Sequence, residues 1–220
     1  MTDSLCNTAK VNIVKISAAD DESASVSTRK ITDSVAREVS VTIRDMDEIV
    51  YETAASPLML KELEAGYLYV RNRSASSSHL GTCAAMNPDK LMNAMKCMLD
   101  SSESFKLTGA MHCAALCRDD EIIYFAEDIS RHNAIYKVIG ACILSNRSHT
   151  STGVGGDNPS NYCLCTSART PASIIRLAID AGITAVISRS APTDAAIELA
   201  LANNIALYGF ASANRINLYT

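Results

Sequence analysis

Residues 162–210 read YCLCTSARTPASIIRLAIDAGITAVISRSAPTDAAIELALANNIALYGF, in which short apolar runs alternate with helical patterns. Strands of buried length are expected over residues 162–166, 183–188 and 205–210. Pro171 opens a helix after the first strand and Gly182 ends it, while Thr193 caps a second helix before the third strand. Strand–helix–strand alternation requires right-handed crossovers between parallel strands. The sequence therefore predicts an α/β domain.

An antiparallel hairpin and a long helix are expected upstream of this unit. Residues 111–117 and 121–126 are largely apolar, and the acidic stretch 118–120 between them suits a turn. Residues 131–144 then have helical periodicity, with apolar side chains on one face. These elements extend the main domain toward the N-terminus.

The N-terminal part of the chain has a different pattern. Residues 1–30 are rich in Ser, Ala, Asp and Thr and are expected to be loosely ordered. Residues 40–51 alternate around an acidic turn, which indicates two strands, and Ser56 with Pro57 then begins a helix over residues 58–69. A polar, serine-rich linker follows. The expected divisions are a loose N-terminus over residues 1–30, a small α+β domain over residues 31–78 and the main domain over residues 79–220.

The overall composition is that of an ordinary globular protein. Hydrophobic residues make up 48% and charged residues 20%, and a net charge of −4 gives no general attraction to nucleic acid or to an anionic membrane. No apolar run approaches the roughly 18 residues that a membrane-spanning helix needs. The first ten residues lack the basic and apolar pattern of a signal peptide. We expect a cytoplasmic protein with neither nucleic-acid nor membrane partners.

The eight cysteines are scattered without paired spacing, and the chain contains no C-x-x-C motif. In a reducing compartment, such residues are mostly small, buried hydrophobic side chains. We therefore expect no disulfide framework.

Three loops follow the carboxyl ends of the predicted parallel strands, where open α/β sheets bind ligands. They span residues 167–170, 188–193 and 211–215, and their arginines are Arg169, Arg189 and Arg215. Two helices also begin at this edge, with unpaired backbone N–H groups and positive dipole ends. The pattern suits an anion site for phosphates, although arginines on ordinary surface loops would give the same spacing.

The densest polar cluster, EDISRHN at residues 127–133, falls between a predicted strand and a predicted helix. Its acids, arginine, histidine, asparagine and serine can bind a polar ligand through many hydrogen bonds. As an alternative, Asp128 or Ser130 would cap the helix and Arg131 would pair with an acid. A second histidine lies upstream, after a glycine-containing turn.

Two runs around these histidines read LTGAMHCAAL at residues 107–116 and EDISRHNAIYKVIG at residues 127–140. They resemble the patterns T-G-G-x-H-x-A-A-L and E-D-V-G-R-H-N-A-x-D-K-x-I-G of the formate dehydrogenase accessory (FdhD) family. Residues 188–193, SRSAPT, are similar to the family's S-x-S-A-P-T loop, and residues 209–220 resemble its ending, G-F-x-R-x-x-R-x-N-x-Y-T. The resemblance covers roughly residues 33 to 220.

This resemblance implies a main domain shaped like cytidine deaminases, with a mixed sheet, a smaller N-terminal domain and a homodimer. It implies that sulfur is taken as a persulfide from a cysteine desulfurase. The recipient would be the molybdenum bis-molybdopterin guanine dinucleotide cofactor that formate dehydrogenase requires. The implied cofactor pocket consists of Thr108, Gly109, His112, Asp128, Arg131, His132 and Asn133. The guanine nucleotide end would contact Phe210, Ala211, Ser212, Ala213, Asn214 and Arg215.

The chain departs from the family pattern in the sulfur-carrying loop. The family reads S-C-G-x-C-G, whereas residues 78–87 read SHLGTCAAMN and keep one thiol, Cys83. Either Leu80 replaces the first family cysteine or Met86 replaces the second. One thiolate suffices to hold a persulfide, while a second would allow release through an internal disulfide. Cys83 is therefore the candidate catalytic residue, and sulfurtransferase activity depends on it.

Other departures keep a second hypothesis open, namely a chaperone that binds the cofactor or the dehydrogenase without transferring sulfur. Family glycines or charged residues are replaced at Ala110, Ser130, Tyr136, Ala168 and Ala213. The two hypotheses differ in what Cys83 does. Both retain the binding pocket.

A zinc-dependent nucleoside deaminase is a further alternative that the implied fold allows. Its chemistry needs one His or Cys and two more Cys on the metal, with a Glu for proton transfer. The expected H-x-E is replaced by His132-Asn133-Ala134, and the expected P-C-x-x-C falls on residues 167–171, which contain no thiol. Cys163 and Cys165 have the wrong spacing for that motif, so we expect no zinc.

Overall fold

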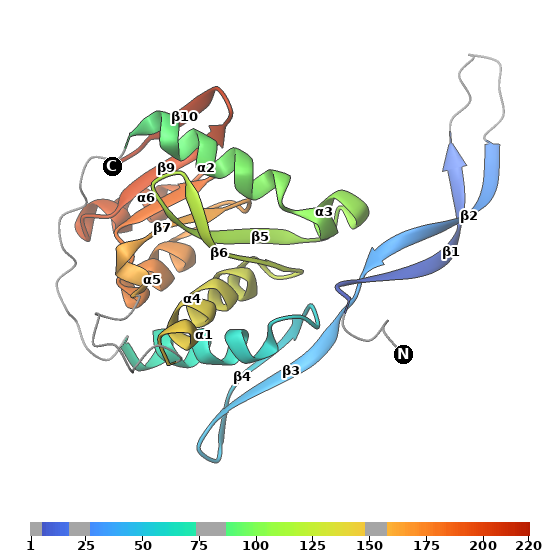
Figure 1. Cartoon of the computed structure of the whole chain (residues 1–220), viewed down its shortest axis with the longest axis horizontal. Helices are drawn as coiled ribbons and strands as arrows, with labels where there is room; N and C mark the ends of the chain where they lie inside the picture. Colours follow the sequence, from blue (N-terminus) through green and yellow to red (C-terminus); the bar gives the residue numbers. More distant parts are fainter. Residues whose placement is uncertain (1–5, 18–26, 74–86, 148–157) are drawn as a thin grey trace.

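The computed structural model of the chain describes residues 6–17, 27–73, 87–147 and 158–220. These residues form a six-stranded mixed sheet in the order β10-β9-β8-β7-β5-β6 (Figure 1). Its parallel strands are β7 (Cys163–Thr166), β8 (Ala185–Ser188) and β9 (Ala206–Ser212). The crossover helices between them are α5 (Ala172–Ala181) and α6 (Asp194–Ala202). The predicted α/β unit is confirmed.

Both crossover helices begin and end where the sequence predicts. Thr193 caps α6, because its Oγ accepts a hydrogen bond from the Ala196 N–H at 3.3 Å. Helix α5 follows Pro171 directly and stops at Gly182, whose φ of 79° favours glycine. Local sequence therefore determines the helix lengths, and with them the positions of the connecting loops.

An antiparallel hairpin extends the sheet on one side. It consists of β5 (His112–Arg118) and β6 (Glu121–Asp128), as predicted. Strand β5 also pairs with β7 in an antiparallel register that sets Ala114 opposite Thr166. At the other side of the sheet, β10 (Arg215–Leu218) pairs antiparallel with β9. This arrangement places the start of β5 beside the ends of β6 and β7.

Helices cover both faces of the sheet (Figure 1). On one face α4 (Arg131–Arg147), α5 and α6 pack into a large apolar cluster that includes Ile135, Ile174 and Ala196. On the other face, α2 (Pro88–Asp100) contributes Leu91 and Met95 to a second cluster. Two short elements complete the body, α3 (Glu103–Thr108) and the 3-10 helix η2 (Pro159–Asn161). None of the helices in the described residues combines the length and apolar content that a membrane-spanning segment requires.

The predicted strands around the acidic turn are β3 (Val39–Asp45) and β4 (Glu48–Ala55), which pair antiparallel. The following helix, α1 (Leu60–Arg73), begins two residues later than the sequence predicts. The reason is that Met59 has a φ of 58°, in the left-handed region, which a right-handed helix cannot include. The expected boundary near residue 78 lies outside the described residues and stays a prediction.

Helix α1 packs directly on α4, at a crossing where each helix has a glycine. A Cβ built on Gly66 would lie 1.9 Å from the Tyr136 carbonyl oxygen, and one built on Gly140 would lie 1.8 Å from the Glu62 carbonyl oxygen. Only glycine at both positions lets the two backbones approach this closely. Val70 of α1 belongs to the same buried cluster as α4 and α5, so α1 is part of the main core.

The N-terminal residues differ from the expectation of a loosely ordered segment. Strands β1 (Thr8–Ser17) and β2 (Ser27–Ala36) pair over ten residues as an antiparallel ribbon that projects from the body (Figure 1). Backbone hydrogen bonds form this ribbon, and Ile13 lies opposite Ile31 in its middle. The apolar side chains of β1, namely Val11, Ile13, Val14 and Ile16, were the available sequence signal for this strand.

Candidate functional site

The three loops predicted to form an anion site lie at one edge of the sheet and are tied together by backbone hydrogen bonds. Arg189 N donates to the Thr166 carbonyl oxygen at 3.0 Å, Phe210 N to that of Ser190 at 3.1 Å, and Thr170 N to that of Ala191 at 3.1 Å. The three arginines, Arg169, Arg189 and Arg215, are exposed at this edge. The positive charge is therefore on the surface here, as the strand order predicts.

The antiparallel strand β5 brings the first histidine motif to the same edge. Cys113 N donates to Ser167 Oγ at 3.0 Å, and Ser167 N donates to the Cys113 carbonyl oxygen at 3.0 Å. On the other side of β5, His112 is paired with Asp128 at the end of β6. Residues from three separate motifs therefore meet at the beginning of β5.

A cavity of about 290 Å³ opens at this meeting point. Its lining combines Gly109 and His112 with Ser167 and Arg189. The volume is close to the lower end of the range for small-molecule sites, so it suits one part of a larger ligand. Two implied pocket residues, Gly109 and His112, thus share a cavity with an arginine of the predicted anion site.

The two histidines have a similar electrostatic environment. Burial lowers the pKa of His112, the positive charge of Arg131 lowers it further, and Asp128 opposes the shift. Burial and then Arg131 likewise lower the pKa of His132, whose Nε2 lies 3.0 Å from Ser173 Oγ at the start of α5. Both imidazoles are therefore mainly neutral at pH 7, and Arg131 is the cation whose charge acts on both of them.

Arg131 is the first residue of α4 and has an unusual contact pattern. Its Nε is buried and donates to no acceptor among the described residues. A buried N–H without an acceptor costs free energy, which a ligand oxygen placed there would recover. Among the implied pocket residues, Arg131 is thus a positively charged side chain with a free donor for an anionic ligand.

Asp128 and Asn133 are fully buried, and their side chains are held by other protein groups. Asp128 Oδ2 lies 2.6 Å from Lys137 Nζ and accepts hydrogen bonds from the Ser56 N–H and Oγ. Asn133 Nδ2 donates to the Ala54 carbonyl oxygen at 2.9 Å and to Asp128 Oδ1 at 3.3 Å. Their role in a cofactor pocket stays a prediction. The hydrogen bonds join the end of β4 to α4, so these two side chains position the start of that helix.

Lys137 was not singled out by the sequence, although it lies within the quoted residues 127–140. It is fully buried, and burial lowers the pKa of Lys137 while Asp128 opposes the shift. Its Nζ also donates to the Ser56 Oγ at 2.8 Å and to the Ser56 carbonyl oxygen at 3.1 Å. A lysine one helical turn after Asn133, inside an otherwise apolar helix, was the available signal.

Thr108 and Glu127 shape the turn that leads into the cavity. Glu127 caps α3, because its carboxylate accepts from Ser102 Oγ at 2.6 Å and from two backbone N–H groups of the helix start. Thr108 Oγ1 donates to the Ser104 carbonyl oxygen at 2.7 Å. Gly109 then ends α3 with a φ of 66°. The Thr108 side chain therefore stabilises the backbone of this turn.

Residues 210–215 comprise the end of β9, a two-residue turn and the first residue of β10, and they lie outside the cavity lining. The Arg215 guanidinium lies over the Phe210 ring, 4.8 Å from its centroid, and Phe210 has a φ of 52°. Ser212 Oγ donates to Asn214 Oδ1 at 3.2 Å, Ala213 is exposed, and Ala211 is fully buried. An aromatic ring with a stacked guanidinium is a surface on which a flat heterocycle can bind.

Cys83, the candidate sulfur carrier, lies outside the described residues, as do Leu80 and Met86. Its position relative to the cavity therefore stays a prediction.

Comparisons with known proteins identify a family. The model of the FdhD/NarQ family matches residues 70–220. Protein FdhD of Methanocaldococcus jannaschii is 43% identical over 118 residues, which are 53% of this chain and 47% of that protein. The sulfur carrier protein FdhD of Bacillus subtilis is 33% identical over 135 residues, which are 61% of this chain and 48% of that protein. The chain thus spans about half the length of the curated relatives that it matches.

A solved structure has the same fold. It is a crystal structure of a Desulfotalea psychrophila protein described as a formate dehydrogenase accessory protein, with a TM-score of 0.74 and 19% sequence identity. The superposition covers 95% of this chain and 96% of that one. At this identity the likeness concerns the fold alone. The family match, however, extends over well more than half of the chain, and the chain belongs to the FdhD/NarQ family.

Proposed function

We propose that this protein is a sulfur carrier, which takes persulfide sulfur from a cysteine desulfurase and delivers it to the molybdenum bis-molybdopterin guanine dinucleotide cofactor of formate dehydrogenase. The observation that carries the proposal is the meeting of Gly109, His112 and Arg189 around one cavity, with the charge of Arg131 acting on both His112 and His132. Relatives named as sulfur carrier proteins support it.

In this proposal the edge of the sheet binds the cofactor through its charges. Arg131 and Arg189, with the N-termini of α5 and α6, bind phosphate oxygens. The guanine base stacks on Phe210 and Arg215. Neutral His112 has one ring nitrogen able to accept and one able to donate a hydrogen bond, and His132, whose Nε2 contacts Ser173 Oγ, has Nδ1 for polar atoms of the pterin.

The sulfur itself is carried by Cys83. Its thiolate attacks the outer sulfur of the donor persulfide, so that the new S–S bond forms on Cys83 as the S–S bond of the donor breaks. The donor leaves as a thiolate, and no external oxidant or reductant is needed. Cys83 is the only cysteine in residues 78–87, and one thiol is sufficient for this step.

The proposal extends to the architecture and setting of the protein. The mixed sheet with α4, α5 and α6 would be a cytidine-deaminase-like main domain, preceded by a small α+β domain. Two copies would associate as a homodimer, and the transfer would take place in the cytoplasm, where desulfurase and dehydrogenase meet the carrier.

Replacing Cys83 with alanine should abolish sulfur uptake. After incubation with a cysteine desulfurase and cysteine, intact-protein mass spectrometry should detect a gain of about one sulfur atom on the wild type, reversible by a thiol reductant. The matched control is Cys97→Ala, which removes a partly exposed thiol of α2 and should retain the gain. A gain that persists in Cys83→Ala would contradict the assigned carrier.

Replacing Arg131 with glutamine should weaken binding of GDP, used as a probe for the guanine nucleotide end, by about 10- to 100-fold. The reason is that a hydrogen bond to a charged group contributes roughly 1.5–3 kcal/mol. Isothermal titration calorimetry would measure the affinity, with Arg29→Gln on the exposed ribbon as the control. Equal affinity in wild type and Arg131→Gln would rule out the phosphate role of Arg131.

A non-catalytic chaperone is the second candidate, because the loop has kept a single cysteine. It would bind the cofactor or the dehydrogenase and leave sulfur transfer to other proteins. The two candidates separate in the experiments above: a chaperone loses binding in Arg131→Gln but gains no sulfur on Cys83. A sulfur carrier loses binding in Arg131→Gln and also gains sulfur on Cys83 in the wild type.

A further inference from the structure

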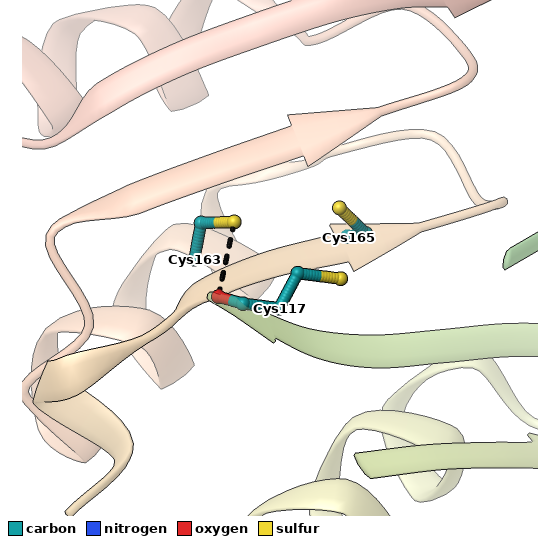
Figure 2. A group of neighbouring side chains, drawn as sticks. All are labelled: Cys117, Cys163 and Cys165. Atoms are coloured by element: carbon teal, nitrogen blue, oxygen red, sulfur yellow. Dashed lines mark hydrogen bonds between the residues drawn. The ribbon is translucent and has the colours of Figure 1, made fainter. Parts of the chain in front are cut away.

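Three of the described cysteines lie together in the core between the sheet and α2 (Figure 2). Cys117 is near the end of β5, and Cys163 and Cys165 are on the adjacent strand β7. Their Sγ atoms all lie within 4.8 Å of one another, and each side chain is at most 3% exposed. The cluster is thus a compact set of soft ligand atoms in a dry environment.

The register of the sheet creates this cluster. Cys117 and Cys163 are directly opposite each other in the β5–β7 ladder, and Cys163 Sγ donates to the Cys117 carbonyl oxygen at 3.4 Å. Cys165 is two residues further along β7, so its side chain points to the same face. Figure 2 shows the three sulfur atoms on the same side of the two strands. The position of each sulfur is therefore determined by backbone pairing.

We propose that Cys117, Cys163 and Cys165 bind a soft monovalent metal ion, copper(I), through their three sulfur atoms. Three sulfur ligands at metal–sulfur distances of about 2.3 Å, arranged in a plane, lie about 4.0 Å apart. Since no separation in the cluster exceeds 4.8 Å, contraction by less than about 1 Å brings the sulfurs to ligand distance.

The chemistry of the ligands selects the ion. Thiolate sulfur prefers copper(I) and other soft ions over magnesium, calcium or manganese. Zinc in structural sites is almost always four-coordinate, whereas this cluster offers three sulfurs. The surrounding side chains of α2 include Met95 and Met98, whose thioethers are themselves soft and uncharged.

Charge balance also favours a monovalent ion. The cluster lies among apolar residues, where a net charge is costly. One copper(I) that displaces one thiol proton leaves the cluster neutral, and each further proton lost adds a negative charge.

This site is separate from the proposed cofactor pocket. His112 begins β5 at the edge that holds the cavity, whereas Cys117 is five residues further along the same strand, near the β5–β6 turn. The third ligand is 46 residues away from Cys163 in the chain, which explains why the Cys-x-Cys spacing alone suggested no metal. The inference does not rest on the sulfur-carrier proposal.

The test is a competition titration of copper(I) from bicinchoninate under anaerobic conditions. The full chain would carry Cys6→Ser and Cys97→Ser, which remove the described cysteines that are not buried, and Cys83→Ser, which removes the proposed sulfur carrier. We expect this protein to withdraw one equivalent of copper(I). Adding Cys163→Ser should weaken the affinity by at least about 100-fold, because loss of a ligand exceeds the 10- to 100-fold effect of losing an outer partner.

The matched control is Cys142→Ser, which changes a fully buried cysteine of α4 in the other apolar cluster and should leave copper(I) binding unchanged. Withdrawal of less than one equivalent, or equal affinity in Cys163→Ser, would overturn the proposal. X-ray absorption on the copper-loaded protein gives an answer that does not require the variants to fold. Three sulfur neighbours at about 2.3 Å would support the site, and nitrogen or oxygen neighbours would refute it.

Discussion

Lys137→Met should lower the free energy of unfolding by about 3–5 kcal/mol, the range expected when one partner of a buried ion pair is removed. Both Lys137 and Asp128 are completely buried, and their charged atoms are 2.6 Å apart. Methionine has a similar shape but leaves the Asp128 carboxylate without its counter-charge. It also removes two hydrogen bonds to Ser56. Urea unfolding followed by circular dichroism would measure the loss.

Two further variants identify the cause. Asp128→Asn combined with Lys137→Met should lose clearly less than Lys137→Met alone, since the double variant buries no unpaired charge. Lys96→Met removes an exposed lysine whose partner, Asp100, is also exposed, and should cost less than about 1 kcal/mol. If the double variant were as unstable as the single one, packing and not charge would explain the loss.

Gly140→Ala should destabilise the protein by about 3 kcal/mol or more, at or above the upper end of the usual effect of overpacking. The added Cβ would lie 1.8 Å from the Glu62 carbonyl oxygen, and the obstacle is backbone, which cannot turn aside as a flexible side chain can. Helices α1 and α4 would have to separate. Because α4 begins at Arg131, GDP binding should weaken together with the thermal stability.

Gly182→Ala is the matched comparison. Its Cβ would meet nothing closer than 3.4 Å, and that atom belongs to the side chain of Arg73, so the penalty comes from the positive φ alone. A left-handed conformation costs a residue with a side chain roughly 1–2 kcal/mol. Equal losses in the two variants would show that the close approach of α1 and α4 is not the source of the effect.

Local signals in the sequence were sufficient for most of the main domain. Thr193 and Gly182 start and end helices through contacts within a few residues, and the sequence shows such contacts directly. The meeting of the three arginine-bearing loops at one edge of the sheet followed from the rule that parallel strands end at one edge. Helix α1 began later than predicted because the left-handed turn at Met59 has no clear sequence signal.

Contacts between distant residues could not be predicted in the same way. Ser56 reaches Asp128 across 72 residues, and Asn133 reaches the Ala54 carbonyl oxygen across 79 residues, so that both implied pocket residues are held in the interior. Cys117 meets Cys163 only through the pairing of β5 with β7. The β1–β2 ribbon depends on backbone pairing between two strands, and the apolar side chains of the first strand do not identify its partner.

The glycine crossing of α1 and α4 has a consequence for how this chain could be recombined with another. Because the two backbones touch at Gly66 and Gly140, the N-terminal segment is not an exchangeable module that can be grafted onto another main domain. A chimera would have to take α1 and α4 from the same parent. The β3–β4 hairpin ahead of α1 belongs to the same unit, because Asp45 at its outer turn forms an ion pair with Arg71 of α1.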